Sequence, residues 1–302
     1  MTHKTCPVCG SSDLKPHVEC EDHLVSHQKF AIVVCGQCGM GMTQNVPSAA
    51  HIGEFYKSEN YISHSDTKKG LINRLYHQVR ILMLKRKQKL VERMTVGKRG
   101  SLLDIGCGTG YFISHMKEQG WKVQGTEPDP DARRIAASQL GQEIPDSAGL
   151  FDLPERSFDV ITMWHVLEHV YELDDYLRQI SFLIREGGSF IVAVPNYTCY
   201  DARRYQENWA AYDVPRHLWH FSPNSITQLV ENYGFQLIAR KGMPFDPFYI
   251  SIISEKYRKN SLGLVTGGLT GAVSLGKSLR DIDQSSSIIY VFKAPLRNTQ
   301  RS

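Results

Sequence analysis

A glycine-rich turn between a short apolar run and a helical pattern is the strongest chemical signal in this 302-residue sequence. Residues 102–105 predict a buried strand, and Gly106, Gly108 and Gly110 follow at alternate positions. Glycine lacks a Cβ atom, so the turn can adopt positive φ and let a ligand reach the N–H groups that open a helix. Glu127 stands 17 residues beyond the last glycine, after a second predicted strand, where it can accept two ribose hydroxyl groups. The spacing predicts a site for a nucleoside cofactor.

The residue that precedes the turn narrows the choice of cofactor. Asp104 would repel the pyrophosphate of a nicotinamide cofactor, but it suits a cationic ligand that carries an amino acid, such as S-adenosylmethionine. The segments LDIGCGTGYF (103–112), GTEPD (125–129) and SFDVITMWHVLEHV (157–170) resemble those of class I S-adenosylmethionine-dependent methyltransferases. The resemblance covers residues 75 to 245 and implies an α/β fold, a Rossmann-like seven-stranded sheet with helices on both faces.

The resemblance also assigns the parts of the cofactor to residues of this chain, because ligands of such sheets lie beyond the carboxyl ends of the strands. Asp104 is expected to hold the ammonium group and Glu127 the ribose, with Pro128 against the adenine. Trp164 and His165 are expected on the sulfonium side, where an aromatic ring adds a cation–π contribution; a core role for Trp164 is the alternative. The expected cofactor residues are Asp104, Gly106, Gly108, Gly110, Glu127, Pro128, Trp164 and His165.

A second constellation lies in the segment YDVPRHLWHFS (212–222), which holds two histidines, a carboxylate, an arginine and three aromatic residues. It resembles a P-R-H-L-x-H-F-S segment of one branch of these methyltransferases. We predict a wall of the acceptor site in which His217 is the general base, surrounded by Asp213, Arg216 and His220. The planar guanidinium of Arg216 suits a phosphate or carboxylate on the acceptor. The alternative is a structural loop whose histidines and arginine are satisfied by hydrogen bonds.

Four cysteines near the start of the chain have the spacing of metal ligands. Cys6 and Cys9 form one C-x-x-C pair and Cys35 and Cys38 a second, with 25 residues between the pairs and a glycine after each. Four thiolates in this pattern predict a closed, tetrahedral structural zinc site, a zinc ribbon. Redox dithiols are the alternative, and neither pair has the βαβ context that they would need.

Hydrophobic periodicity places these residues on alternating strands and helices. Helical spacing of apolar residues runs from 71 to 94, and its lysines and arginines predict a solvated basic face; a membrane-surface or phosphate-binding role is the alternative. The predicted strands span 101–105, 121–126, 142–146, 158–163, 189–194, 234–239 and 287–292, and the predicted helices lie near 111–119, 132–140 and 173–183. We expect a zinc ribbon at 1–46, a linker with a helical lead-in at 47–98 and the methyltransferase domain at 99–302.

Composition and motifs limit the function. A formal net charge of only +4 gives no large surface for nucleic acid, and a D/N-P-P-Y turn typical of nucleobase N-methylation is missing after strand 158–163. We therefore expect methylation of a small-molecule acceptor, such as a nucleotide- or lipid-linked sugar, at oxygen or carbon. The alternatives are an RNA methyltransferase that uses the ribbon to bind RNA, and a non-catalytic, zinc-dependent interaction protein. The polar start of the sequence predicts a cytoplasmic protein, and the apolar segment 262–279 predicts either a packed helix or peripheral membrane contact.

Overall fold

The computed structural model describes residues 1–56 and 71–296. The segment 57–70, predicted as a linker or flap that includes Tyr61 and His64, lies outside the described residues.

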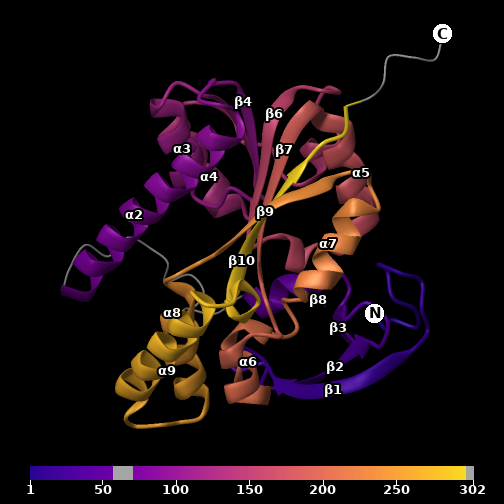
Figure 1. Cartoon of the computed structure of the whole chain (residues 1–302), viewed down its shortest axis with the longest axis vertical. Coiled ribbons are helices and arrows are strands. Elements are labelled where there is room, and N and C mark those ends of the chain that lie inside the picture. Colours follow the sequence, from indigo (N-terminus) through magenta and orange to yellow (C-terminus); the bar gives the residue numbers. More distant parts are fainter. Residues whose placement is uncertain (57–70, 297–302) are drawn as a thin grey trace.

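A six-stranded mixed sheet forms the centre of the structure (Figure 1), with the strand order β5-β4-β6-β7-β10-β9. The first four strands are parallel, whereas β10 is antiparallel to both β7 and β9. This confirms the predicted Rossmann-like sheet. The strands are β4 (Ser101–Ile105), β5 (Lys122–Thr126), β6 (Phe158–Trp164), β7 (Ile184–Pro195), β9 (Gln236–Gly242) and β10 (Ser287–Lys293).

Helices cover both faces of this sheet and bury two apolar cores against it (Figure 1). Local signals explain where these helices begin and end: the Asp129 side chain caps the first turn of α4, and Gly141 ends α4 in a left-handed conformation. Ser222 and Ser225 form a capping box at the start of α7. One face carries α2 (Leu71–Met94), α3 (Tyr111–Glu118) and α4 (Pro130–Leu140), and the other carries α5 (Leu173–Leu183) and α7 (Pro223–Glu231).

Two predicted details of the sheet are wrong. Residues 142–146 form no strand, so the described sheet has six strands instead of seven. A single backbone hydrogen bond, from Glu127 N to Pro145 O, ties this segment to the end of β5, and Pro145 has no N–H with which to extend a ladder. The strand predicted at 189–194 begins earlier, at Ile184, and Gly187 and Gly188 lie within β7.

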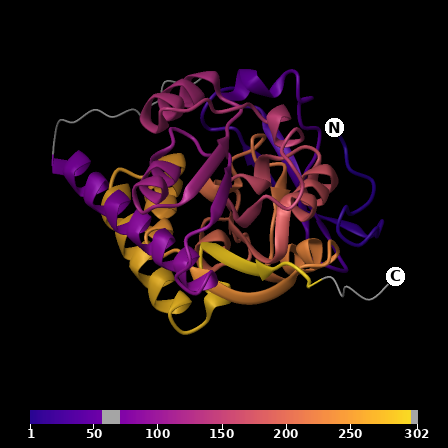
Figure 2. The same cartoon turned by 90° about the horizontal axis from the view of Figure 1, so that it is seen from above.

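Additional elements gather at the carboxyl end of the parallel strands (Figures 1 and 2). The N-terminal strands β1 (Leu14–Glu21), β2 (Lys29–Cys35) and β3 (Gly41–Thr43) form a second sheet with β8 (Trp219–His220), in the order β1-β2-β3-β8. The segment after β7 forms α6 (Tyr200–Tyr205), and the segment between β9 and β10 forms the hairpin of α8 (Asp246–Tyr257) and α9 (Gly263–Ser278). The short 3-10 helices are η1 (Ile52–Tyr56), η2 (Ala148–Leu150), η3 (Leu167–His169), η4 (Gln206–Asn208), η5 (Ala210–Tyr212) and η6 (Ile282–Gln284).

Candidate active site and metal centre

The three glycines of the turn between β4 and α3 all have positive φ, but they have different roles. A Cβ atom at Gly106 would lie 2.5 Å from Val166 Cγ2, and one at Gly110 would lie 3.0 Å from Ala136 Cα. These two glycines allow close packing. A Cβ atom at Gly108 would meet no atom within 4 Å, so this residue faces open space. Gly108 is therefore the position at which a ligand can contact the turn, as a cofactor does in this type of site.

Glu127, at the end of β5, lies directly beside this open position. Its Oε2 accepts a hydrogen bond from Gly108 N at 2.7 Å, and its Oε1 accepts one from Asp129 N at 3.0 Å. Burial raises the pKa of Glu127, although both N–H groups oppose the shift. The carboxylate is held against the turn, where ribose hydroxyl groups can reach it, and the neighbouring Pro128 is exposed next to it. These contacts fit the predicted nucleoside cofactor.

Asp104 is buried at the end of β4 and accepts a hydrogen bond from Thr162 Oγ1. Burial raises the pKa of Asp104 to about 7, against the opposing effects of Thr162 and Lys87. Lys87 of α2 reaches this region, and its Nζ lies 4.1 Å from the ring centroid of Trp164. Burial lowers the pKa of Lys87 to about 8, although Asp104 and Asp246 oppose the shift. The helix that we predicted to present a solvated basic face therefore contributes a cation to the site.

Trp164 and His165 lie at the carboxyl end of β6, as predicted. The Trp164 ring contacts Phe112 edge to face with centroids 5.5 Å apart, and its buried Nε1 has no hydrogen-bond partner among the described residues. His165 adopts a φ of 58°, and its ring lies between two carboxylates, with Nδ1 3.4 Å from Glu168 Oε1 and Nε2 3.4 Å from Asp246 Oδ2. Burial lowers the pKa of His165, but the carboxylates outweigh it and raise the pKa to about 10. The ring is therefore a cation at neutral pH.

Next to His165, three side chains form a cluster of hydrogen-bond acceptors: Glu168, His169 and His217. One ligand atom from each lies within 4.8 Å of the others. Nδ1 of His169 lies 3.0 Å from the carbonyl oxygen of Arg216, and Nδ1 of His217 lies 2.9 Å from that of Ala211. A carbonyl oxygen only accepts, so each Nδ1 carries a proton, and Nε2 is the ring nitrogen left to accept one.

Two donors among the described residues lie at the edge of this acceptor cluster: the Tyr56 hydroxyl, 3.1 Å from His169 Nδ1, and His165 Nδ1, which forms an ion pair without hydrogen-bond geometry 3.4 Å from Glu168 Oε1. Neither carboxylate oxygen of Glu168 has a hydrogen-bond partner there, and the residue is fully buried. Burial raises the pKa of Glu168, but the charge of His165 outweighs it and holds the pKa below its ordinary value. Burial and the adjacent His217 lower the pKa of His169 to about 4, which keeps its ring neutral. The cluster can therefore receive a hydroxyl proton, and it also has the donor set to hold a divalent metal ion.

The structure corrects the roles predicted for three residues around His217. Arg216 is 2% exposed and is fully engaged: it contacts Asp213 at 2.7 Å, Asp22 at 3.0 Å and the Phe55 carbonyl oxygen at 2.8 Å. Its guanidinium is therefore closed to a phosphate on an acceptor, and Asp213 serves as its partner. His220 is also buried, with Nε2 2.8 Å from Thr43 Oγ1, and burial lowers its pKa well below the ordinary value. For Arg216 and His220 the structure supports the alternative of a locked loop, whereas Asp213 also lies beside His217 as predicted, with Oδ2 4.0 Å from Nε2.

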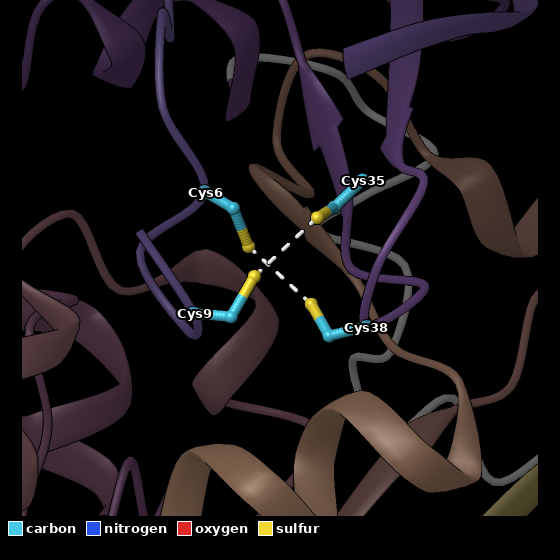
Figure 3. A group of neighbouring side chains, drawn as sticks. All are labelled: Cys6, Cys9, Cys35 and Cys38. Carbon is cyan, nitrogen blue, oxygen red and sulfur yellow. Dashed lines mark hydrogen bonds between the residues drawn. The ribbon is translucent and has the colours of Figure 1, made fainter. Parts of the chain in front are cut away.

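The four cysteines converge on one point at the end of β2 (Figure 3). Cys6 Sγ lies 3.4 Å from Cys38 Sγ, and Cys9 Sγ lies 3.5 Å from Cys35 Sγ. Gly10 and Gly39 follow the two pairs at φ of 73° and 75°, and their N–H groups close the tight turns by donating to the carbonyl oxygens of Cys6 and Cys35. All four sulfur atoms lie within 4.8 Å of one another, which fits a single tetrahedral ion with bonds of about 2.3 Å.

This cysteine centre supports the segment that carries His217. β3, which follows the second cysteine pair, forms backbone pairs Gly41↔His220 and Met42↔Trp219 with β8. The Asn224 side chain donates to the Cys38 carbonyl oxygen at 3.0 Å. β1 and β2 pair antiparallel next to the centre, which gives the ribbon its strands.

Sequence reasoning missed four residues of the site. Glu168 and His169 belong to the quoted LEHV segment, whose pattern favours a helix-bracing role for His169 over a role as a motif histidine. Lys87 was hidden in a basic, helical pattern, and Asp246 lies in a segment without a motif. The position of Glu168 and His169 along the chain could have indicated their role. They lie in η3, which begins three residues after β6 ends, at the edge of the sheet where ligands bind.

Comparison with known proteins agrees with this geometry. Residues 76–240 match the family described as "Methyltransferase domain", which is more than half of the chain, so the chain belongs to this family. The ubiquinone biosynthesis O-methyltransferase of Methylobacterium nodulans is 30% identical over 165 residues, which are 49% of this chain and 64% of that protein. Its counterpart in Ruegeria pomeroyi is 32% identical over 172 residues, which are 52% of this chain and 67% of that protein.

A solved structure shares the fold. A protein from Galdieria sulphuraria, described as a sarcosine dimethylglycine methyltransferase, aligns with a TM-score of 0.50 at 12% identity, over 74% of this chain and 88% of that one. Together with the family match and the glycine turn, the fold identifies the chain as a class I S-adenosylmethionine-dependent methyltransferase. The alignment with the Methylobacterium protein spans less than two thirds of that protein. The family match begins at residue 76, so the N-terminal cysteine centre lies outside it.

Replacing Glu127 with alanine should weaken S-adenosylmethionine binding by about 1.5 to 3 kcal/mol, because charge-assisted hydrogen bonds to the ribose would be lost. Isothermal titration calorimetry with the full chain measures this loss. Asp131→Ala is the matched control, since this carboxylate lies in the first turn of α4 and is exposed. Equal affinity in the Glu127 variant and the wild type would contradict the assigned cofactor site.

Proposed function

We propose that this chain transfers the methyl group of S-adenosylmethionine to a hydroxyl oxygen of a small-molecule acceptor. The observation that carries the proposal is the acceptor cluster of Glu168, His169 and His217, in which both carboxylate oxygens of the buried Glu168 lack a hydrogen bond among the described residues. An acceptor hydroxyl would supply a donor. The relatives from Methylobacterium nodulans and Ruegeria pomeroyi are both named O-methyltransferases, which supports transfer to oxygen in preference to carbon.

In this mechanism S-adenosylmethionine supplies an electrophilic methyl group, and the protein orients the acceptor and removes its proton. Gly108 and Glu127 would bind the cofactor, and Trp164 and His165 would line the side where the methyl group is presented. Nε2 of His217 would take the hydroxyl proton as the acceptor oxygen receives the methyl group that the cofactor's sulfur gives up, because Nδ1–H is fixed on the Ala211 carbonyl oxygen and leaves Nε2 to accept. The Glu168 carboxylate, which lies beside both imidazoles, stabilises the protonated ring.

We also propose that the four cysteines bind one structural zinc ion. Four thiolates at tetrahedral spacing match the donor set of closed zinc sites, and no position remains for a substrate. The role of the metal is then to hold β3 in register with β8, and so to hold the segment that carries His217. This role accounts for the ribbon without RNA binding.

The acceptor itself is proposed by class. The Arg216 guanidinium is already paired with Asp22 and Asp213, so the structure gives no support for a phosphate bound there. A nucleotide-linked sugar is therefore a less favoured acceptor. A sugar or phenol hydroxyl on an uncharged or lipid-linked carrier fits the cluster. Nucleic acid is disfavoured by the modest net charge of +4.

The direct test is incubation of the purified chain with methyl-labelled S-adenosylmethionine and an extract divided into small-molecule, lipid and RNA fractions. We expect label in a small-molecule or lipid fraction as an alkali-stable methyl ether. The Glu168→Gln variant is the control, because it keeps the side-chain volume but removes the carboxylate charge, and it should give little label. Label confined to RNA, or cofactor binding without any transfer, would favour one of the two alternative functions.

A further inference from the structure

Helix α9 presents its apolar side chains to solvent and its small or polar ones to the protein. The outward residues are aliphatic and strongly exposed: Leu262 66%, Leu264 73%, Val265 62%, Leu269 64%, Val273 47% and Leu279 80%. The buried residues of the helix are Gly267, Thr270, Gly271 and Ser274. A surface helix of a globular protein ordinarily has the opposite arrangement, with the apolar stripe facing the core. The outward stripe of α9, defined by these six aliphatic residues, therefore lacks a partner among the described residues.

The inward contacts show that α9 cannot turn this aliphatic stripe toward the core. A Cβ atom at Gly267 would lie 2.7 Å from Ile252 Cα, and one at Gly271 would lie 2.7 Å from Phe248 Cα. Only glycine allows α8 and α9 to approach so closely. On the same side, Ser274 Oγ donates to the buried Asp201 carboxylate at 2.8 Å. Rotation of the helix would bring leucine or valine into both positions, so the exposure of the stripe is built into the hairpin.

The exposed charges beside the aliphatic stripe are predominantly positive, with Asp281 directly after the segment 256–280. Residues 256–280 contain no aspartate or glutamate, and they contain five exposed cations: Lys256, Arg258, Lys259, Lys277 and Arg280. Three of these precede α9 and two lie at its end. An aliphatic face flanked by cations is the pattern of a helix that lies in a membrane interface and is attracted by anionic headgroups.

We propose that α9 docks this chain on the surface of an anionic lipid bilayer, with the aliphatic stripe in the acyl region and the five cations at the headgroups. A second copy of this chain is a poorer occupant, because a symmetric contact through the stripe would place five cations of one copy against five of the other. The helix has 16 residues, a length of about 24 Å, and none of the helices in residues 1–56 and 71–296 is long and apolar enough to cross a membrane. Docking is therefore parallel to the surface.

Docking through α9 would also place the active site close to lipid. The hairpin begins with Asp246, whose carboxylate lies 3.4 Å from Nε2 of His165, and it extends from the carboxyl end of the sheet (Figure 1). An acceptor carried in the bilayer would then approach the side of the protein that holds the cluster. The docking proposal does not depend on catalysis, so it can fail while the proposed function stands.

Co-sedimentation with sucrose-loaded vesicles tests the proposal with the full chain, without cofactor or acceptor. We expect binding to phosphatidylcholine vesicles with about 30 mol% phosphatidylglycerol, and weaker binding to pure phosphatidylcholine or in about 0.5 M salt. Leu264→Gln with Leu269→Gln should reduce binding to the anionic vesicles by about tenfold or more. The control is Ile135→Gln with Phe182→Gln, two exposed apolar positions on other helices, and it should bind like the wild type.

Because both leucines are exposed, the variant should keep the circular dichroism spectrum and melting temperature of the wild type, and these measurements exclude unfolding as the cause of lost binding. Three results would overturn the proposal: no preference for anionic vesicles, equal binding by the Leu264/Leu269 variant, or binding lost equally in the control variant. The chain could instead fail to bind vesicles and form a concentration-dependent dimer that the leucine substitutions dissociate. That result would identify the stripe as an interface between two copies of the chain.

Discussion

Replacing His217 with alanine should slow methyl transfer by about a hundred- to ten-thousand-fold, the usual loss when a general base is removed. The affinity for S-adenosylmethionine should hardly change, because His217 lies in the acceptor cluster and not beside Gly108 or Glu127. Single-turnover kinetics with labelled cofactor measures the rate, and calorimetry measures the affinity. The Nδ1 contact with the Ala211 carbonyl oxygen is a single hydrogen bond, so its loss should cost only about 1 kcal/mol of stability.

His220 is the matched control for this experiment. It lies three residues away and is also buried, but its Nε2 faces Thr43 within the β3–β8 pairing. His220→Ala should lower the melting temperature and leave the rate per folded molecule within a few-fold of the wild type. A His217 variant that behaves like the His220 variant would show that His217 is structural. Activity that is abolished by a chelator selective for non-thiolate sites, and restored by a divalent cation, would show that the acceptor cluster works as a metal site instead.

Replacing Cys35 with serine should release the metal ion and unfold the N-terminal sheet locally, because the binding free energy of structural zinc, about 10 kcal/mol or more in zinc-finger peptides, is folding free energy for so small a module. The wild-type chain should contain about one zinc per molecule by elemental analysis. Since β3 pairs with β8, methyl transfer should fall sharply, whereas cofactor binding at the β4–α3 turn should persist.

Cys20→Ser provides the control for the zinc prediction. Cys20 lies in β1 of the same sheet and is buried, but it is outside the group of four cysteines. This variant should keep its zinc and most of its activity. Protein prepared without chelator that contains no zinc, or a Cys35 variant that keeps full zinc content, would refute the assignment.

The sequence by itself determined the parts of this protein that depend on local chemistry. Positive φ and close backbone approach require glycine, so the three alternating glycines predict the turn at 106–110. The structure shows φ between 56° and 85° at these glycines. Tetrahedral metal binding requires thiolates at a short, regular spacing, which the two C-x-x-C pairs display. The order of the sheet strands followed from periodicity. The prediction was wrong at 142–146, where Pro145 has no N–H to extend a ladder, and at the start of β7, which begins at Ile184.

Only the tertiary structure decided which of several similar side chains meet. The segment 212–222 predicted His217 as the base with Arg216 and His220 beside it in the site. Arg216 instead pairs with Asp22, a residue 194 positions away, and His220 with Thr43, so both are closed. His217 instead meets Glu168 and His169. Likewise, helical periodicity in 263–278 shows that an apolar face exists, but not whether it is buried. The glycines that lock α9 against α8 decide that it faces outward, because contact between two helix backbones is a property of the packed pair and not of either segment.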